Sequence, residues 1–441
     1  MLKSFYLQNT TYYIAGLAAV IFVLSYLFNF FYILAVLLLV LLVLAILLDA
    51  ILLFSQRNAV LAHRTTADRF SLGDENKVVL TIVNGFGFKV KLEIIDEIPV
   101  QFQQRNWLMK SHLDKNETQN IQYFLRPVQR GVYEFGNINV FVNGPLKLSK
   151  RRFIFKVAQT VSVYPSYIQM KRYQLLATSN HLQEAGMKRI RKLGHSMEFE
   201  QIKEYVRGDD YRTINWKATA RKRDLMVNSF TDERSQQVYC VINKGRLMKM
   251  PFDGMTLLDY AINACLVLSN VVISKQDKAG LITFAEKPDT FIQADKNVIQ
   301  MNLLMESLYS QQTSFLEADY ESLYAVLRNR VSHRSLLILF TNFETLEGLE
   351  RELPSLKMMA KYHLLLVVVF ENTEVDKLIN SVPVTVEEIY IKTIAGKYAY
   401  EKKMIVKELR KNGILSILTK PAQLTIDTLN KYLELKGRNQ V

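Results

Sequence analysis

Residues 12–54 form one long apolar run, and the hydrophobic pattern of the chain changes twice after it. The run is almost wholly Leu, Ile, Val, Ala and aromatic residues, and its only charge is Asp49, near the far end. A helix that crosses the hydrocarbon core of a bilayer needs about 20 apolar residues. The run therefore predicts two membrane-spanning helices, Tyr12–Asn29 and Phe31–Phe54, in a transmembrane helical hairpin of residues 1–56. A cleaved signal peptide is the alternative, but its apolar core is shorter and ends at small residues.

Short alternating runs follow, as is typical of β-strands with one buried face. Examples are "KVVLTIVN", "KVKLEIIDEI", "GVYEFGNINVFV" and "TVSVYP", which are separated by turn dipeptides such as Asn-Gly and Gly-Asn. We expect residues 57–165 to form an all-β, immunoglobulin-like sandwich. Its sequence shows no clustering of catalytic residue types.

From Ser235 onward, apolar strands alternate with amphipathic helices. Runs such as "QVYCVIN", "SLLILFTN" and "HLLLVVVF" are continuously apolar, which indicates strands buried on both faces. This pattern predicts a doubly wound α/β domain over residues 235–441, with a parallel sheet between two layers of helices. Ligands bind such sheets beyond the carboxyl ends of the strands, where Asn243 and Asn342 fall. The intervening residues 166–234 are expected to be a charged, partly helical connector.

The distribution of charge predicts on which side of the membrane the ends of the hairpin and the rest of the chain lie. Lys3 precedes the first predicted span, Arg57 and Arg64 follow the second, and the turn between the spans is uncharged. The positive-inside bias therefore predicts a multi-pass membrane protein with both ends of the hairpin, and hence the soluble domains, in the cytoplasm. Cys240 and Cys265 fall in predicted core segments, which fits a reducing compartment and argues against a structural disulfide.

The formal net charge is +14, yet Lys and Arg are interleaved with Asp and Glu in most of the chain. Two denser basic runs, "MKRIRKLG" and "WKATARKRD", are suited to membrane lipid headgroups or to an acidic partner. We do not expect nucleic acid as a partner, because the sequence has no zinc-ligand spacing, aromatic RNA-binding signature or helix-turn-helix pattern.

The connector holds the most distinctive string of the chain, "YVRGDDYRTINWKATARKRD". Gly208 permits a tight turn after Arg207, and Asp209 or Asp210 can cap the helix that follows. That helix is expected to carry Arg212, Trp216, Lys217 and Arg221. The two carboxylates are either an acid/base or metal pair, or a capping and ion-pair cluster that fixes the connector to the last domain. We favour the second interpretation, because no His, Cys or third carboxylate follows on the helix.

This string resembles the signature of the bacterial proteins grouped as domain-of-unknown-function family fifty-eight. The similarity includes the surrounding "GHSMEFEQIKEYVRGDDYRTINWKATARKRDLMVNSFTDER" and extends to "RPVQRGVYEFGNINVFVNGPLKL" and the closing "LRKNGILSILTKPAQLTIDTLNKYLELK", nearly the whole chain. The resemblance implies a membrane-anchored assembly factor or adaptor that acts with a MoxR-type AAA+ ATPase. It also implies that the last domain is similar to a von Willebrand factor A domain.

Such a domain binds metal at an adhesion site built from an Asp-x-Ser-x-Ser loop, a later Thr and an Asp after a central strand. The matching positions here are Asn243, Gly245, Leu247, Thr313 and Asn342, so only the threonine keeps its residue type. A hard divalent cation needs several oxygen ligands, some of them anionic. The loop instead adds Lys244 and Arg246, which raise the local potential. We therefore expect no metal or other cofactor, with Mg²⁺ held by Asp253, Glu317 or Asp319 as the alternative.

The sequence thus predicts a membrane-anchored cytosolic scaffold that binds protein partners, and not an enzyme. Its six histidines are scattered, without a His-x-x-x-His pair, and no Ser lies in a nucleophile-elbow pattern. The predicted binding face consists of the degenerate metal loop, Asn243 to Leu247, together with Thr313 and Asn342. A metal-dependent receptor of the von Willebrand A type is the rival hypothesis.

Overall fold

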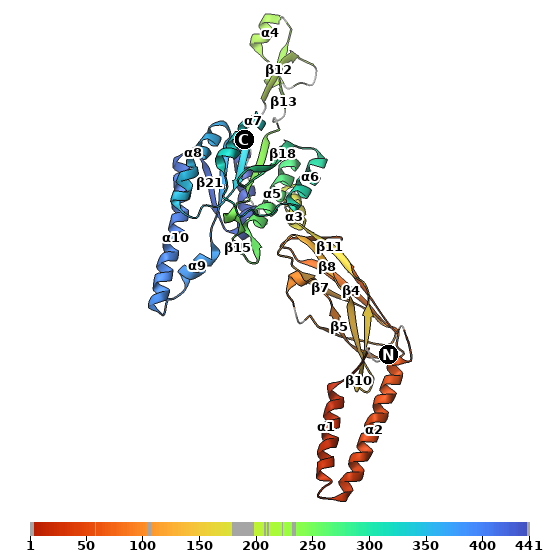
Figure 1. Ribbon diagram of the computed structural model, residues 1–441. Helices are drawn as coiled ribbons and strands as arrows, with labels where there is room; N and C mark the ends of the chain where they lie inside the picture. Colours follow the sequence, from red (N-terminus) through yellow and green to blue (C-terminus); the bar gives the residue numbers. More distant parts are fainter. Residues whose placement is uncertain are drawn as a thin grey trace. The chain divides into compact units, whose positions relative to one another are not determined.

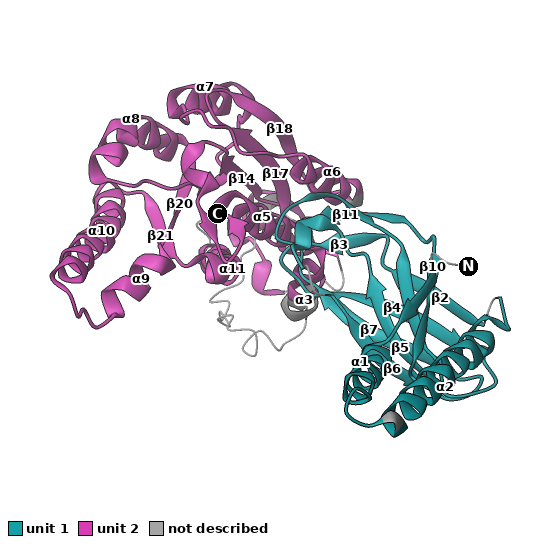
Figure 2. Ribbon diagram, turned by 60° about the horizontal axis from the view of Figure 1, so that its bottom comes forward, with its two compact units in different colours: residues 1–164 teal, residues 165–441 magenta. Residues whose placement is uncertain are grey.

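A computed structural model describes residues 4–57, 59–104, 107–178, 198–206, 209, 211–222, 224–231 and 235–438. The chain divides into two compact units, residues 1–164 and 165–441 (Figure 2). The prediction of a multidomain chain is confirmed. Its elements are shown in Figure 1.

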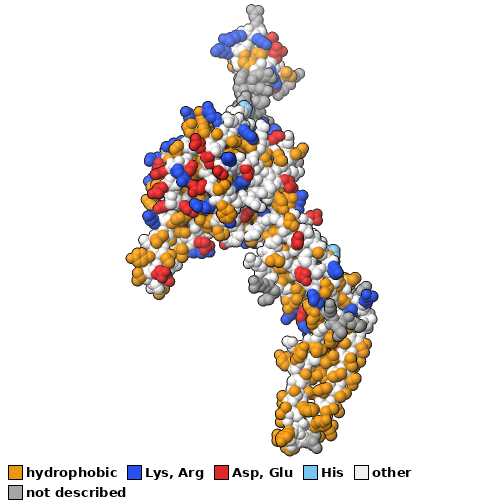
Figure 3. Space-filling view, in the orientation of Figure 1, with side chains coloured by type: hydrophobic (Ala, Val, Ile, Leu, Met, Phe, Trp, Pro, Cys, Tyr) orange, Lys and Arg blue, Asp and Glu red, His pale blue; other side chains and the backbone are white. Residues whose placement is uncertain are grey.

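Unit 1 begins with an apolar helical hairpin. Helix α1 (Asn9–Leu24) has 16 residues and helix α2 (Asn29–Phe54) has 26. The turn lies at residues 25–28, so the first helix ends earlier than predicted and is shorter than a typical span. Hydrophobic side chains cover the surface of the hairpin in Figure 3. By length and composition, α2 and α5 (Leu257–Ser274) are the two described helices able to cross a membrane, but the apolar window of α5 is 83% buried inside unit 2.

The rest of unit 1 is built of β-strands in three sheets. Strand β1 precedes the hairpin and pairs with β10, so residues before the hairpin belong to the β-structure, which the sequence did not indicate. The sheet orders are β1-β10-β9-β5-β6, β2-β4-β7 and β3-β11-β8. The strands are β1 (Phe5–Leu7), β2 (Val60–Thr66), β3 (Arg69–Ser71), β4 (Asn76–Asn84), β5 (Val90–Asp96), β6 (Met109–Leu113), β7 (Thr118–Leu125), β8 (Gly131–Phe135), β9 (Ile138–Asn143), β10 (Ser149–Phe155) and β11 (Gln159–Tyr164).

The alternating sequence of these strands directs every second side chain into the core. Leu80 and Ile82 of β4 and Ile94 of β5 are fully buried. Arg64 of β2 also points inward, where its guanidinium forms a buried ion pair with Asp96 of β5 and donates to the carbonyl oxygens of Val157 (3.0 Å) and Gly136 (3.1 Å). The Tyr123 hydroxyl donates to the same carboxylate. A fully hydrogen-bonded charge pair therefore joins two of the sheets.

Asp49, the only charge of the apolar run, fastens the hairpin to the β-structure. It is completely buried and accepts hydrogen bonds from the backbone N–H groups of Leu146 (3.0 Å), Leu148 (3.2 Å) and Ser149 (2.9 Å) and from the Ser149 hydroxyl (2.8 Å). Arg151 donates to the carbonyl oxygen of Leu53 near the end of α2 (2.5 Å). The membrane-type helices and the β-sheets are thus one structural unit.

Unit 2 contains a six-stranded sheet of order β18-β17-β14-β19-β20-β21. All neighbouring strands are parallel except the edge strand β18, which is antiparallel to β17. The predicted parallel sheet is confirmed, whereas β18 was not foreseen. The strands are β14 (Gln237–Asn243), β17 (Lys278–Phe284), β18 (Pro288–Asp295), β19 (Leu336–Phe340), β20 (Leu364–Phe370) and β21 (Leu415–Thr419), with a small pair β15 (Pro251–Phe252) and β16 (Met255–Thr256).

Helices cover both faces of this sheet, which explains the continuously apolar strands. Val238 and Cys240 of β14 pack in a core with α5, while Tyr239 and Val241 pack in the opposite core. The first core also includes α6 (Val298–Tyr309) and α11 (Leu424–Gly437). The second includes α7 (Tyr320–Arg330), α8 (Leu346–Tyr362) and α10 (Val386–Lys411), and α9 (Thr373–Asn380) packs against α10.

The predicted connector contains a helix and a β-hairpin. Helix α3 (Tyr167–Thr178) packs against α5, and the Ser166 N–H donates to the Asn263 side chain (2.9 Å). Strand β12 (Glu198–Glu204) pairs antiparallel with β13 (Met226–Thr231). Between them lie a 3-10 turn (Tyr211–Thr213) and helix α4 (Trp216–Lys222). The helical content was expected, but the two-stranded pairing was not.

Candidate functional site

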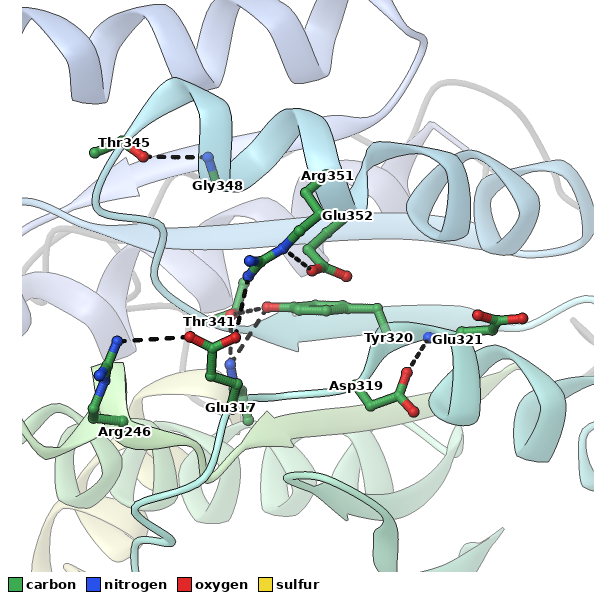
Figure 4. A network of polar contacts seen from close by, with 11 residues as sticks. Arg246, Glu317, Asp319, Tyr320, Glu321, Thr341, Thr345, Gly348, Arg351 and Glu352 are labelled. Atoms are coloured by element: carbon green, nitrogen blue, oxygen red, sulfur yellow. Dashed lines mark hydrogen bonds and ion pairs between the residues drawn. The ribbon is translucent and has the colours of Figure 1, made fainter.

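Asn243 is the last residue of β14, an inner strand of the sheet in unit 2. Its side-chain oxygen and nitrogen both form hydrogen bonds within this unit. Its Oδ1 accepts from the Gly245 N–H (2.7 Å), and its Nδ2 donates to the Thr341 hydroxyl (2.9 Å) and the Tyr320 hydroxyl (3.4 Å). Tyr320 and Thr341 are themselves 2.6 Å apart through their hydroxyl oxygens (Figure 4). The side-chain oxygen of Asn243 therefore fixes its own loop.

Lys244 points toward β18, the edge strand of the sheet. Its ammonium forms an ion pair with Asp289 of β18, and the residue is 7% exposed. Burial raises the pKa of the Asp289 carboxyl, but the hydrogen bond and charge of Lys244 outweigh that effect and hold the pKa below its usual range. Lys244 is therefore paired with a carboxylate of its own domain.

Asn342, at the end of β19, contacts a buried lysine of α10. The Lys402 ammonium donates to Asn342 Oδ1 (2.7 Å) and to the carbonyl oxygen of Phe343, and both Asn342 and Lys402 are 2% exposed. Burial lowers the pKa of Lys402 to about 8, against the opposing charge of Glu344. The oxygen that would have to bind a metal ion at this position thus binds an ammonium of the chain itself.

No role for Lys402 was predicted from the sequence, although the spacing of apolar residues around it indicates a buried position. Lys402, Ile405, Val406 and Leu409 recur at the spacing of one helix face, and all four are buried. A lysine in the apolar stripe of an amphipathic helix requires a hydrogen-bonding partner, because burial of an unpaired charge is costly.

The remaining metal-loop residues and the proposed substitute ligands do not assemble into a metal site. Thr313 is half-buried and does not line the cleft that opens beyond the ends of β14 and β19. Asp319 caps α7 by accepting from the N–H groups of Glu321 (2.9 Å) and Ser322 (3.1 Å), and Asp253 lies in a turn with φ of 47°. Among the described residues, no group of three or more His, Cys, Asp or Glu side chains is placed to hold a metal ion.

A cleft of about 460 Å³ opens beyond the ends of β14 and β19. Gly245, Arg246 and Leu247 line it together with both asparagines, so the structure brings most of the predicted face together. The rim is not basic, as the sequence had suggested, because its charged residues are two arginines and four glutamates: Arg246, Arg351, Glu317, Glu344, Glu347 and Glu352.

Ion pairs run along this rim (Figure 4). Glu317 lies 3.7 Å from the Arg246 guanidinium and 3.4 Å from that of Arg351, and Arg351 also contacts Glu352 at 2.9 Å. The side chains of Arg246, Glu317 and Arg351 are about two-thirds exposed, at 63%, 65% and 67%. Exposed pairs of this kind add little stability, so their members can exchange partners at small cost.

The Gly-Asp-Asp string falls partly outside the described residues, which exclude Arg207, Gly208 and Asp210. Asp209 accepts from the Val206 N–H (3.0 Å) and the Lys203 ammonium (2.9 Å), and these bonds lower the pKa of its carboxyl. Asp209 does not cap α4, and the alternative cap, Asp210, lies outside the described residues. Helix α4 is instead capped by Asn215, which accepts from the Ala218 N–H (3.0 Å), whereas Arg212, Trp216, Lys217 and Arg221 lie on the surface.

Comparisons with solved structures give weak similarities. BatB, a conserved hypothetical protein from Bacteroides thetaiotaomicron, is 13% identical, with a TM-score of 0.32 over 46% of this chain and 100% of that chain. The ASH/PapD-like domain of human CEP192 is 15% identical, with a TM-score of 0.19 over 24% of this chain and 87% of that domain. Neither similarity assigns a fold.

A curated relative is the "Uncharacterized protein YeaD" of Bacillus subtilis (strain 168), which is 27% identical over 126 residues. The matched segment is 28% of this chain and 31% of the relative, so the chain spans about a third of that protein. The resemblance expected over nearly the whole chain is found for part of it. Residues 201–388, which include the whole Gly-Asp-Asp string and the cleft, match the family described as "Protein of unknown function DUF58".

Proposed function

We propose that this protein is a membrane-anchored scaffold or adaptor whose cleft binds a protein partner without a metal ion. The hairpin of α1 and α2 inserts into the bacterial inner membrane, and the β-structure of unit 1 and the whole of unit 2 lie in the cytoplasm. By the family resemblance, the partner is a MoxR-type AAA+ ATPase, and the process is complex assembly or the response to envelope stress. Unit 2 is interpreted as a von Willebrand A-like domain, which the parallel sheet and the position of the cleft support.

The observation that carries the proposal is the exchangeable set of ion pairs on the rim of the cleft. Glu317 is shared loosely by two arginines, and all three side chains are largely exposed. A carboxylate of a partner can replace Glu317 at Arg246 or Arg351, while a partner cation can bind the released glutamate. Complementary charges of this kind steer association and select partners, even where each pair adds little affinity.

The asparagines favour a metal-free mode of binding. Asn243 is held by Gly245, Tyr320 and Thr341, and Asn342 by Lys402. Both loops are therefore fixed by the protein itself, and neutral amides are poor substitutes for anionic ligands of a divalent cation. We also propose a structural and not a catalytic role for Asp209, because its carboxylate accepts hydrogen bonds from the Val206 N–H and the Lys203 ammonium.

The test is affinity purification of the tagged full-length chain from detergent-solubilised membranes. We expect the wild type to recover a MoxR-type ATPase and the Arg246→Glu/Arg351→Glu variant to lose most of it. Arg438→Glu is the matched control, because Arg438 is also 63% exposed and paired with a glutamate. Recovery of no ATPase by the wild type, under extraction conditions that preserve a known membrane complex, would refute the proposed partner.

A further inference from the structure

The segment between β12 and β13 exposes two aromatic side chains beside several cations. Tyr211 is 70% exposed, Trp216 is 72% exposed, and helix α4 buries none of its residues. Lys and Arg side chains gather over α4 in Figure 3. Single exposed aromatic residues are common, but α4 is also held in a fixed orientation and carries an uneven distribution of charge.

Helix α4 is fastened on one side and open on the other. Thr219 Oγ1 accepts from the Met226 N–H of β13 (3.0 Å), and the Ala218 N–H donates to the capping Asn215 (3.0 Å). With about 3.6 residues per turn, Ala218 and Thr219 share the side that faces the hairpin. Trp216, Lys217 and Arg221 share the opposite side, and all three are exposed. The helix thus presents one aromatic ring flanked by two cations.

This outward side has no internal counter-charge among the described residues. Lys217 and Arg221 are four residues apart on the helix, a spacing at which like charges destabilise it. Neither they nor Lys222 forms an ion pair within the described part of the chain. Asp209 lies nearby in sequence, but its carboxylate is bound by Lys203 and Val206. An external anion would relieve the repulsion between the two cations.

The charge pattern also selects the kind of anion. Residues 198–234 carry eight Lys or Arg and eight Asp or Glu, so this part of the chain has no net charge. Between residues 211 and 223, however, there are five cations and no acid. Acidic residues lie on both sides of this run in the sequence, among them Asp209 and Asp224, so a broad polyanion such as a bilayer or a nucleic acid duplex is opposed by their charge. A short acidic segment can contact the cations alone.

We propose that Trp216, Lys217 and Arg221 form a second docking surface, which binds an acidic polypeptide segment of a protein partner. Trp and Arg are the residue types that most often dominate binding energy at protein interfaces. The surface extends the proposed scaffold role to residues that take no part in the cleft. The two proposals can therefore fail separately.

The experiment uses the single tryptophan of this surface as its own probe. The chain has two tryptophans, so Trp107→Phe leaves Trp216 as the only one. This full-length chain is placed in phosphatidylcholine nanodiscs and titrated with a synthetic Glu-rich peptide that contains Phe, and with its Gln counterpart. We expect the Glu peptide to shift the Trp216 emission to shorter wavelength with saturation. Absence of a shift, or an equal shift with the Gln peptide, would overturn the proposal.

Charge reversal tests the role of the two cations. Lys217→Glu/Arg221→Glu is expected to weaken binding of the Glu peptide by about tenfold, the effect of losing two exposed charge pairs. Lys403→Glu/Lys407→Glu is the matched control, since it reverses two exposed lysines four residues apart on α10 and should bind as the wild type does. An equal loss in this control would overturn the proposal, because net charge alone would then explain binding. The milder Lys217→Gln/Arg221→Gln variant must weaken binding in the same direction, and thermal unfolding verifies that it folds.

Two further arms identify the class of partner and separate this surface from the cleft. If nanodiscs with equal parts of phosphatidylcholine and phosphatidylglycerol, or a DNA duplex, shift the emission while the peptide does not, the surface binds a polyanion and the proposal is wrong. Arg246→Glu/Arg351→Glu should bind the peptide normally even where it loses the ATPase. Loss of peptide binding in that cleft variant would show that the peptide binds at the cleft and would refute the second surface.

Discussion

Replacement of Lys402 by Met tests whether a buried ammonium occupies the place of a metal ion. Burial lowers the pKa of Lys402 from its ordinary value of 10.5 to about 8. Between these two pH values the unfolded chain holds the proton and the folded chain has released it, so the folding stability contributed by this group rises with pH. Below pH 8 the folded protein bears the cost of the buried charge. This destabilisation disappears, and the folded state becomes more stable, as the pH rises above 8 and the amine becomes neutral.

The expected magnitude follows from the difference in pKa. A shift of this size corresponds to about 3 kcal/mol, of which roughly 2.5 kcal/mol is recovered between pH 7 and pH 10. The neutral amine still has two N–H donors for Asn342 Oδ1 and the Phe343 carbonyl oxygen. In Lys402→Met both buried acceptors lose their donor, at a cost of about 1–3 kcal/mol each. The stability advantage of the wild type over Lys402→Met should therefore be smallest at pH 7 and should increase toward pH 10.

The assay is thermal and denaturant unfolding of the full-length chain in detergent micelles at pH 7, 8, 9 and 10. Other titrating groups are common to both proteins and cancel in the difference, provided that the same unfolding transition is followed. Lys403→Met is the control, because Lys403 is exposed and one residue away. Its difference from the wild type should not depend on pH. An advantage over Lys402→Met that stays constant or declines toward pH 10 would refute the buried-ammonium argument.

Three further predictions concern the anchor, the core of unit 1 and the metal loop. Asp49→Ala leaves four hydrogen-bond donors without an acceptor and should destabilise unit 1 by roughly 3–5 kcal/mol. The loss is measured as faster proteolysis of the protein in membranes. An Asp49→Asn variant that is cleaved as fast as the alanine variant would contradict a hydrogen-bonding role. Arg64→Met should cost about 3–5 kcal/mol in denaturant unfolding, and the additional Asp96→Leu change should restore most of it; no recovery would disprove the uncompensated-charge explanation. Calorimetric titration with Mg²⁺ or Mn²⁺ should give no saturable heat, and a heat lost in Thr313→Ala would reverse our view of the loop.

The sequence predicted the main elements of unit 2 well, because strands buried on both faces leave an unambiguous pattern. Strand β14 ends at Asn243, as expected, and helix α5 follows it before the next strand of the sheet, as the predicted alternation of strands and helices requires. The edge strand β18 was missed, because its sequence mixes polar and apolar residues and shows neither a continuous apolar run nor a strict alternation. The pairing of β1 with β10 was equally hidden, because a three-residue strand has no period and its partner lies more than a hundred residues away.

The candidate site was predicted by position and not by chemistry. Family resemblance located the loop at Asn243 and the end of the central strand at Asn342, and both line the cleft. The charge of the rim was predicted wrongly, because Lys244 turns to Asp289 and the glutamates come from later loops and from α8. Such contacts between distant segments depend on side-chain directions, which one sequence does not encode in any local pattern. The binding role of that rim stays a prediction.

Asp49, Arg64 and Lys402 share a signal that a sequence does contain. Each is a charged residue at a buried position of an otherwise apolar face: in α2, on the inward side of β2 and in the buried stripe of α10. An unpaired charge there would destabilise the fold, so each must bind polar groups from elsewhere in the chain. All three contact the backbone of a distant segment, at residues 146–149, at Gly136 and Val157, and at Phe343 respectively. A lone charge on a predicted apolar face therefore marks a junction between elements, even where its partner cannot be named in advance. In this chain one such junction joins the apolar hairpin to its β-structure, and another fixes the loop beside the proposed docking cleft.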